Sequence, residues 1–549
     1  MLRVREPVLR TGSVRLGRTV WRCALAAGGT GARTGVRRSG GGHGVAARRR
    51  RSARPTLRRS LPGTLVARRG IAGLVLLAVG ILLLVPVTRG IDVIDDAVGA
   101  AQLPVRTYVP ASAASGSAPG VVVAHGFAGS ARLMHSWSLA LAHAGFVVVA
   151  PDLPGHGANP VPLRSTSERD AAALVGAVDL AMDHLRAIPA VDPGRIGLLG
   201  HSMGSGAVLE HGVTRVDRVR AVVAVSPTDA EVDPAAPRDL LLLAGANEGR
   251  FVENAESLLA RAGGERGAPG DGDARALTIV PVVEHVSILF SRAAYDASID
   301  WLAASLDHVP TGRAPTGPLA GWSLLALGLV LLWQALAAQA ATAASAPARR
   351  PGGWVALGVG GVAATASLVI IARSVDVPAV TGVLVAGEVG IWFLLTGLVW
   401  LRFGVRPARP DSRDLGWLVL ATAMLVLLGA STSLAWAPWW LSGVRVGAAA
   451  LLALLLLPFG LAAASALHGR KGRTVVGMWG ATSLIVLVTL GAAAVVVPGI
   501  GFLLLVLPLM PLVLAATTAT TVGVDRPWAS GVASAVFIGW LLAMLFPLA

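Results

Sequence analysis

Apolar residues follow two different patterns along this chain. From about Asp92 to His308, short apolar runs alternate with longer amphipathic segments, whereas after about residue 319 long apolar runs follow one another almost without charge. The first pattern is typical of an α/β fold, and the second indicates helices long enough to span a bilayer. The chain is therefore predicted to hold an α/β domain at 92–308 and an all-α membrane domain at 319–549.

The α/β domain is predicted to contain seven strands and five helices. The expected strands are Val105–Val109, Gly120–Ala124, Phe146–Ala150, Arg195–Leu199, Ala221–Val225, Leu240–Ala244 and Ala276–Val280. The expected helices are 131–144, 168–187, 203–212, 251–262 and 291–306. Because strands and helices alternate, we expect a mostly parallel sheet with helices on both faces.

One further apolar run precedes this domain. The run from Ile71 to Val87 carries no charge and follows Arg68-Arg69, so we expect an uncleaved transmembrane signal anchor at 68–88. A cleavable signal with Val98-Gly99-Ala100 as its small-residue site is the alternative, although that site lies far from the run. The paired arginines are also compatible with a twin-arginine export signal. In each case the residues after the run are exported.

The membrane domain is predicted to contain eight helices after a linker at 309–318. They are expected at 319–341, 354–372, 380–401, 416–435, 446–467, 474–497, 499–521 and 528–548. Pro498-Gly499 divides the sixth from the seventh, because proline interrupts a helix. With the anchor, the chain should cross the membrane nine times.

The composition agrees with this division. Hydrophobic residues make up 54% of the chain and charged residues 14%, which is typical of a polytopic membrane protein. The formal net charge of +16 comes from the first 70 residues, where 18 arginines face a single acidic residue, Glu6. Such a segment cannot bury a core, so 1–67 is predicted to be a disordered cytoplasmic tail that rests on anionic head groups. A nucleic-acid-binding arm is the alternative, and the lack of interleaved aromatic residues disfavours it.

The charges between the predicted spans set the expected orientation. If the tail is cytoplasmic, only Arg373 and Arg445 fall in outer loops, while ten basic residues fall in inner ones: Arg349, Arg350, Arg402, Arg406, Arg409, Arg413, Arg470, Lys471, Arg473 and Arg526. Trp436, Trp439 and Trp440 would form an outer interfacial belt. We therefore expect a multi-pass plasma-membrane protein whose α/β domain is extracytoplasmic.

The strongest candidate for chemistry is Ser202. It lies in Gly200-His201-Ser202-Met203-Gly204, directly after an apolar run, and this fits the Gly-x-Ser-x-Gly pattern of a strand-to-helix nucleophile elbow. The glycines are needed because strand and helix backbones come very close in such a turn. A serine nucleophile also needs an imidazole base, an acid to orient it and N–H donors for the oxyanion.

Four landmarks in chain order show a resemblance to a known superfamily. They are Val123-Ala124-His125-Gly126-Phe127, Pro151-Asp152-Leu153-Pro154-Gly155-His156-Gly157, the elbow, and Glu284-His285. With them, residues 104–306 resemble the α/β-hydrolase superfamily, in particular compact serine hydrolases of the monoglyceride lipase and serine aminopeptidase type. The resemblance implies that His285 is the catalytic base and that the N–H groups of Phe127 and Met203 form the oxyanion hole. It also implies structural roles for His125, Asp152, His156 and Gly157.

The acid departs from the superfamily pattern. Where Gly-x-x-Asp is usual, this chain has Gly245-Ala246-Asn247-Glu248, so Glu248 takes the matching position and can orient a histidine as aspartate does. Asp229, which follows the preceding strand, is the alternative. A third possibility is that the acid is missing and that activity is weak.

The predicted elements also bear on the substrate. Only about fourteen residues separate Val225 from Leu240, too few for a helical cap, so we expect an open site. An open extracytoplasmic site at a membrane suits an ester or amide of a lipid, a peptide or a cell-envelope polymer. The expected partners are thus the bilayer and this substrate, with no nucleic acid. The acyl-enzyme would be resolved by water or, in an acyltransferase, by an acceptor alcohol.

Two features remain outside this scheme. Glu388 is expected near the middle of a membrane span, where a carboxylate must be protonated, paired or facing a polar cavity, unless the span is placed in the wrong register. The single cysteine, Cys23, excludes a disulfide framework and a cysteine metal cluster, and we expect neither metal nor cofactor. A membrane-bound serine hydrolase is the favoured function. The alternative is a transport or assembly protein whose α/β domain binds without catalysis.

Overall fold

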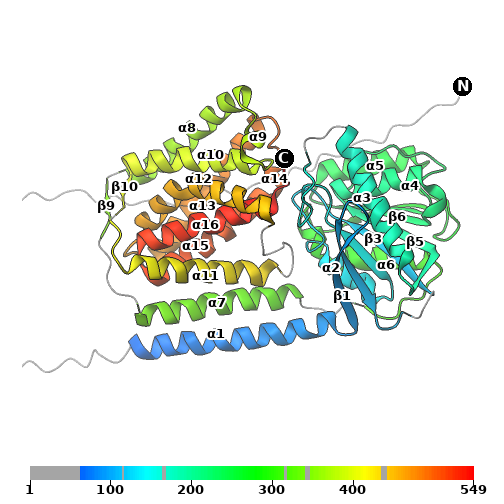
Figure 1. The fold of residues 1–549 in the computed structure, drawn as a ribbon, viewed down its shortest axis with the longest axis horizontal. Coiled ribbons are helices and arrows are strands. Elements are labelled where there is room, and N and C mark those ends of the chain that lie inside the picture. The colour runs from blue at the N-terminus through cyan, green and yellow to red at the C-terminus, as the bar shows by residue number, and fades with distance from the viewer. Residues whose placement is uncertain are drawn as a thin grey trace, which may run out of the picture. The chain divides into compact units, whose positions relative to one another are not determined.

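An eight-stranded sheet with flanking helices and a bundle of apolar helices make up the described part of the chain (Figure 1). This computed structural model describes residues 62–113, 117–163, 168–313, 318–340, 346–350, 352–407, 409–433 and 442–549. Three predicted features lie wholly or partly outside these ranges: the Arg-rich tail, the linker at 309–318, and the loop with Trp436, Trp439 and Trp440.

The sheet is mostly parallel, as expected. Its strands are β1 (Ile91–Val98), β2 (Leu103–Pro110), β3 (Ala118–Ala124), β4 (Val147–Pro151), β5 (Val191–His201), β6 (Ala221–Val225), β7 (Leu240–Gly245) and β8 (Arg275–Val280). They are arranged in the order β1-β2-β4-β3-β5-β6-β7-β8. The β1/β2 and β2/β4 pairs are antiparallel, and every later pair is parallel.

Helices cover both faces of the sheet and bury it completely at its centre. The side chains of Val121 and Val123 on β3 join a core with α2 (His135–His143) and α6 (Arg292–Ser305). Val122 and Ala124 point the other way, into a core with α3 (Glu168–Ala187), α4 (Met203–Thr214) and α5 (Gly249–Arg261). A strand buried on both faces must be apolar at every position, which explains the continuous apolar runs in the sequence.

Strand β1 was missed by the sequence analysis. Its sequence, Ile-Asp-Val-Ile-Asp-Asp-Ala-Val, is buried only at its two ends, because β1 is an edge strand that pairs only with β2. Asp95 on this edge forms an ion pair with Arg106 of β2, with 2.6 Å between Oδ1 and Nε. An exposed edge rich in acids shows no apolar run, and charged edges also discourage pairing with other chains.

The bundle contains nine helices in the described ranges that are long and apolar enough to cross a membrane. Its helices are α1 (Pro62–Leu84), α7 (Pro318–Ala340), α8 (Gly353–Ser374), α9 (Val377–Thr381), α10 (Ala386–Phe403), α11 (Asp414–Ser433), α12 (Gly443–Leu467), α13 (Arg473–Val496), α14 (Leu503–Val506), α15 (Met510–Val524) and α16 (Pro527–Leu545). Two-residue strands β9 (Ala348–Arg349) and β10 (Val405–Arg406) pair at one end.

The segment of the bundle that contains Glu388 differs from its prediction. The expected helix at 380–401 is divided into short α9 and long α10, because Gly382 ends α9 in the left-handed conformation and Val385 adopts a φ of 65°. Val383, Leu384 and Val385 at the break are apolar, so hydropathy does not show it. Glu388 therefore lies in the first turn of α10 and not near the middle of a long helix, as the predicted span 380–401 would place it.

Candidate active site

Ser202 occupies a strained turn between a strand and a helix. It follows the last residue of β5 and precedes the first residue of α4, with φ 52° and ψ −122°. A Cβ on Gly200 would clash with the carbonyl of Gly204, and a Cβ on Gly204 would come within 2.5 Å of the His125 oxygen. The two glycines of the elbow thus allow the close approach that the pattern predicts.

His285 lies within hydrogen-bonding distance of Ser202. It is located in the loop between β8 and the short 3-10 helix Ser287–Phe290, and its Nε2 is 3.1 Å from Ser202 Oγ. The ring of Phe251 stacks on the imidazole, with 4.1 Å between centroids. His201 Nε2 lies 3.1 Å from the backbone oxygen of His285. Burial holds the pKa of His201 well below its usual range, so a neutral His201 can donate this bond without adding a charge beside the site.

Glu248 holds the other side of the His285 ring. Its Oε2 is 2.9 Å from His285 Nδ1. Its Oε1 accepts a hydrogen bond of 2.7 Å from the hydroxyl of Ser226 and another from the N–H of Gly245. Both carboxylate oxygens are therefore fixed, although glutamate has one more methylene than the usual aspartate.

Asp229, the alternative acid, lies elsewhere. Its Oδ1 forms an ion pair with Arg261 of α5, and 80% of its side chain is exposed. The structure thus brings Ser202, His285 and Glu248 together and leaves Asp229 out of this group.

The two residues predicted to form the oxyanion hole flank the serine. Met203 is the first residue of α4, so its N–H belongs to the first turn, where a helix leaves donors free. Phe127 lies in the loop after β3, next to Gly126, at which a Cβ would come within 2.9 Å of Ser202 Cβ. The N-terminus of α4 also places positive potential beside the serine, which suits a developing oxyanion.

A second loop, residues 152–158, supports the loop that contains Phe127 through hydrogen bonds. The Asp152 carboxylate accepts hydrogen bonds from Ala131 and Ala158 N–H, at 2.7 and 2.8 Å. The N–H of Ala128 donates to His156 Nε2 at 3.2 Å, and that of Leu153 donates to His125 Nε2 at 3.0 Å. Burial lowers the pKa of both histidines, which keeps them neutral and able to accept. Structural roles for His125, Asp152 and His156 are confirmed by these contacts.

The site has no helical cap, and its three central side chains are buried. No helix is present between β6 and β7, but Ser202 is only 3% exposed, and His285 and Glu248 are also buried. The ring of Phe127 stacks on Phe502, which precedes α14, with 4.5 Å between centroids. A residue of the bundle thus packs on the loop that is predicted to form the oxyanion hole.

The comparison with protein families agrees with this architecture. Residues 119–280 match the model of the family described as alpha/beta hydrolase fold. This part of the chain has the α/β-hydrolase fold. We call the region from β1 to α6 the hydrolase domain; its fold supports a hydrolase activity.

Three of the solved structures that are similar to part of this chain are titled as hydrolases. A CIB-like hydrolase from Thermoplasma acidophilum is 21% identical, covers 39% of this chain and 99% of its own, with a TM-score of 0.31. Dienelactone hydrolase from Anabaena variabilis is 22% identical, and the match covers 40% of this chain and 98% of that protein, with a TM-score of 0.31. An esterase from Pyrobaculum calidifontis is 15% identical, and the match covers 44% of this chain and 92% of that protein, with a TM-score of 0.32. No curated protein matches the chain.

Several residues around the site escaped the sequence analysis. Ser226 orients Glu248, Phe251 packs on His285, and Phe502 reaches the oxyanion loop from the bundle. Only Ser226, which follows β6, carried any local hint. Phe251 and Phe502 lie far along the chain from the residues that they contact, and only the tertiary fold brings them close. Among the described residues, no group of three or more His, Cys, Asp or Glu is arranged to hold a metal ion.

Proposed function

We propose that the chain is a membrane-bound serine hydrolase that cleaves an ester or amide through Ser202, His285 and Glu248. The observation that carries this proposal is the position of the His285 ring, with Nε2 3.1 Å from Ser202 Oγ and Nδ1 2.9 Å from Glu248 Oε2. Such distances are those required of a nucleophile, its base and an orienting acid.

The reaction begins when His285 Nε2 takes the hydroxyl proton of Ser202 as Oγ attacks the substrate carbonyl. The N–H groups of Phe127 and Met203 stabilise the oxyanion, and Glu248 stabilises the imidazolium. His285 then gives its proton to the departing alcohol or amine, which leaves an ester on Ser202. A water molecule, deprotonated by His285, attacks this ester and releases the acid and the free serine.

Acyl transfer is the second candidate, because the ester on Ser202 can pass to an acceptor alcohol as well as to water. Adding an acceptor alcohol during turnover separates the two reactions. Hydrolysis yields only free acid, whereas transfer yields a new ester of that alcohol.

The nucleophile is tested by a fluorophosphonate probe on the full chain in membranes. We expect the wild type to be labelled and to hydrolyse a panel of ester, thioester and peptide substrates, and Ser202→Ala to lose both. Labelling or hydrolysis that Ser202→Ala leaves unchanged would instead support a domain that binds without catalysis.

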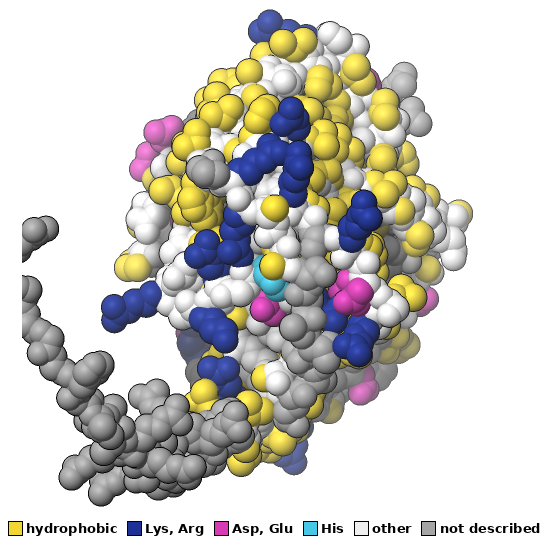
Figure 2. Space-filling model, turned by 90° about the vertical axis from the view of Figure 1, so that its left-hand side faces the viewer, with side chains coloured by type: hydrophobic (Ala, Val, Ile, Leu, Met, Phe, Trp, Pro, Cys, Tyr) yellow, Lys and Arg dark blue, Asp and Glu magenta, His cyan; other side chains and the backbone are white. Residues whose placement is uncertain are grey.

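We also propose that the protein is a multi-pass plasma-membrane protein with a cytoplasmic N-terminus and an extracytoplasmic hydrolase domain. Figure 2 shows Lys and Arg side chains gathered on the end of the bundle that carries β9 and β10. Exposed basic residues at this end include Arg349, Arg402, Arg406, Arg470 and Lys471. An end rich in exposed basic residues is expected to face the cytoplasm.

The orientation is tested with single cysteines. The chain has one cysteine, so Cys23→Ser gives a background for Lys471→Cys at the basic end and Asp271→Cys in an exposed loop of the hydrolase domain. We expect a membrane-impermeant maleimide to label intact cells only through Asp271→Cys. Labelling of Lys471→Cys alone would reverse the orientation.

A further inference from the structure

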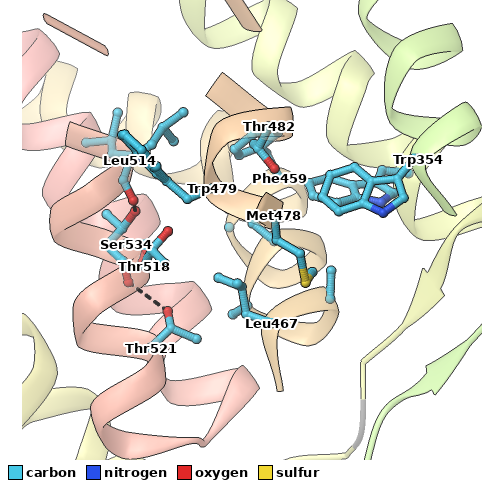
Figure 3. A pocket seen from close by; sticks show the side chains of 17 residues that line it. Trp354, Phe459, Leu467, Met478, Trp479, Thr482, Leu514, Thr518, Thr521 and Ser534 are labelled. Carbon is cyan, nitrogen blue, oxygen red and sulfur yellow. Dashed lines mark hydrogen bonds between the residues drawn. The ribbon is translucent and has the colours of Figure 1, made fainter. Parts of the chain in front are cut away.

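Two cavities in the described part of the chain differ in what they can hold. The first lies within the bundle, and its lining includes Trp354, Phe459, Trp479, Thr482 and Ser534 (Figure 3). Its volume of about 30 Å³ has room for no more than a few water molecules. The second has a volume of about 1610 Å³, well above that of an ordinary ligand pocket. Only the second is large enough for an organic substrate.

The larger cavity reaches the residues that flank the nucleophile. Phe127 and Met203 of the hydrolase domain line it. Leu384, Val385 and Phe502, at the ends of bundle helices, line it from the other side. The cavity is therefore formed jointly by the two parts of the chain, and its apolar side chains come from both.

Glu388 is a buried carboxylic acid residue among those that line this cavity. It is 5% exposed, and its Oε2 has no hydrogen-bond partner among the described residues. A buried carboxylate oxygen without a partner is costly, because it has lost its hydration without a replacement. A ligand group that donates a hydrogen bond would remove this cost. Because of the break between α9 and α10, Glu388 lies in the first turn of α10, beside this cavity.

Acidic residues outnumber basic ones in the lining of this cavity. Seven acidic residues and two arginines line it. The acidic members include Glu210, Glu231 and Asp376, and the basic ones are Arg215 and Arg373. An excess of acidic groups disfavours a phosphate or carboxylate head group and favours a neutral or cationic one.

We propose that this cavity is the substrate site and that it takes an acyl ester whose head group donates hydrogen bonds to Glu388 from a hydroxyl or an ammonium. This inference rests on the proposed serine hydrolase and names its substrate class. The acyl carbonyl lies between Phe127 and Met203, the chain lies along the apolar lining, and the head group reaches the first turn of α10. The bundle thus contributes a binding residue as well as an anchor.

The experiment varies the head group on one acyl chain. The full-length protein in detergent micelles is given 1-oleoylglycerol, O-oleoylethanolamine, 1-oleoylglycerol phosphate and methyl oleate. We expect kcat/KM of the wild type to be highest for the first two. Glu388→Leu should reduce their advantage over methyl oleate by ~10-fold or more, because a hydrogen bond to a charged group is lost.

Two further variants separate binding from folding. Glu388→Gln keeps a hydrogen-bond acceptor, so it should lose the preference for the ammonium ester and retain part of that for the glycerol ester. Asp525→Asn is the control. It removes a carboxylate that pairs with His468 and does not line the cavity, so the order of the four esters by kcat/KM should stay that of the wild type. Rates are compared per fluorophosphonate-labelled serine, so that misfolded protein does not count.

The inference is wrong if the wild type cleaves all four esters equally, or if Glu388→Leu keeps the wild-type order. If no variant cleaves any ester, binding of the uncleavable ether 1-O-oleylglycerol to Ser202→Ala decides. If the double variant Ser202→Ala with Glu388→Leu binds the ether at least ~10-fold more weakly than Ser202→Ala does, the head-group site is supported even though the proposed hydrolase function fails. Equal binding by the two proteins would overturn the site as well.

Discussion

At the scale of single residues, Glu248 is fixed by three partners rather than one. Ser226 and Gly245 hold one of its oxygens, so the other oxygen can only face His285. A glutamate is longer and more flexible than an aspartate, and an unsupported one would lose rotamer entropy when it orients a histidine. The two extra hydrogen bonds offset this cost, which explains how glutamate can take a position where aspartate is usual.

Replacing Glu248 by alanine should slow turnover by about 10²- to 10⁴-fold, because His285 would lose the group that orients its ring and stabilises its charge. Substrate hydrolysis by the full-length protein measures the effect. Asp229→Ala is the matched control, since Asp229 contacts Arg261 and not His285. A large loss in Asp229→Ala with near-normal turnover in Glu248→Ala would reverse the assignment.

At the scale of elements, glycines allow the bundle helices to approach each other closely. A Cβ on Gly531 of α16 would come within 2.9 Å of the Gly460 oxygen on α12, and a Cβ on Gly460 would clash with the Gly531 carbonyl. Likewise, a Cβ on Gly73 of α1 would come within 2.9 Å of the Gly328 oxygen on α7. Helices in a membrane gain stability mainly from such close packing.

Helix α12 provides a matched pair of glycines to test this packing. Gly460 meets α16, whereas a Cβ on Gly447 of the same helix would meet nothing within 4 Å. We expect Gly460→Ala to lower the melting temperature in detergent, because the helices must move apart. Gly447→Ala should keep or raise it, since alanine is the better helix former by about 1 kcal/mol. Equal melting temperatures for the two variants would contradict the packing argument.

The boundaries of most elements could be predicted from sequence within a few residues, and the failures have physical causes. Strand β1 lies at an exposed edge and lacks an apolar run, while the break before α10 is made of apolar residues and does not interrupt one. Hydropathy measures burial and not backbone conformation. A hydropathy pattern therefore misses the exposed strand β1 and also misses the buried, apolar turn before α10.

At the scale of the whole molecule, Arg445 links the bundle to the hydrolase domain. It is fully buried in the first turn of α12, and its guanidinium donates to the carbonyls of Gly155 and Gly157 in the loop that supports the oxyanion loop. The same group donates to the carbonyls of Ala543 and Phe546. Nearby, the N–H of Leu163 donates to Leu548 O at 2.9 Å.

Replacing Arg445 by methionine should lower the free energy of unfolding by about 3 kcal/mol or more, because carbonyls that it satisfies would stay buried without donors. We also expect slower fluorophosphonate labelling of Ser202, because the 152–158 loop would lose its support. Thermal unfolding and the labelling rate measure the two effects. Arg406→Met, at an exposed arginine beyond α10, is the control, and equal behaviour of the two variants would show that Arg445 supports neither the fold nor the site.

The sequence by itself determined the division into an α/β domain and apolar helices, the elbow at Ser202 and the chain order of the candidate residues. These follow from local patterns, because strand, helix and tight turn each have their own spacing of apolar residues and glycines. Only the tertiary structure decided which acid meets His285, which helix end carries Glu388 and what covers Ser202. His285 lies 83 positions from Ser202 and 37 from Glu248, and sheet pairing and packing, which no local pattern encodes, bring them together.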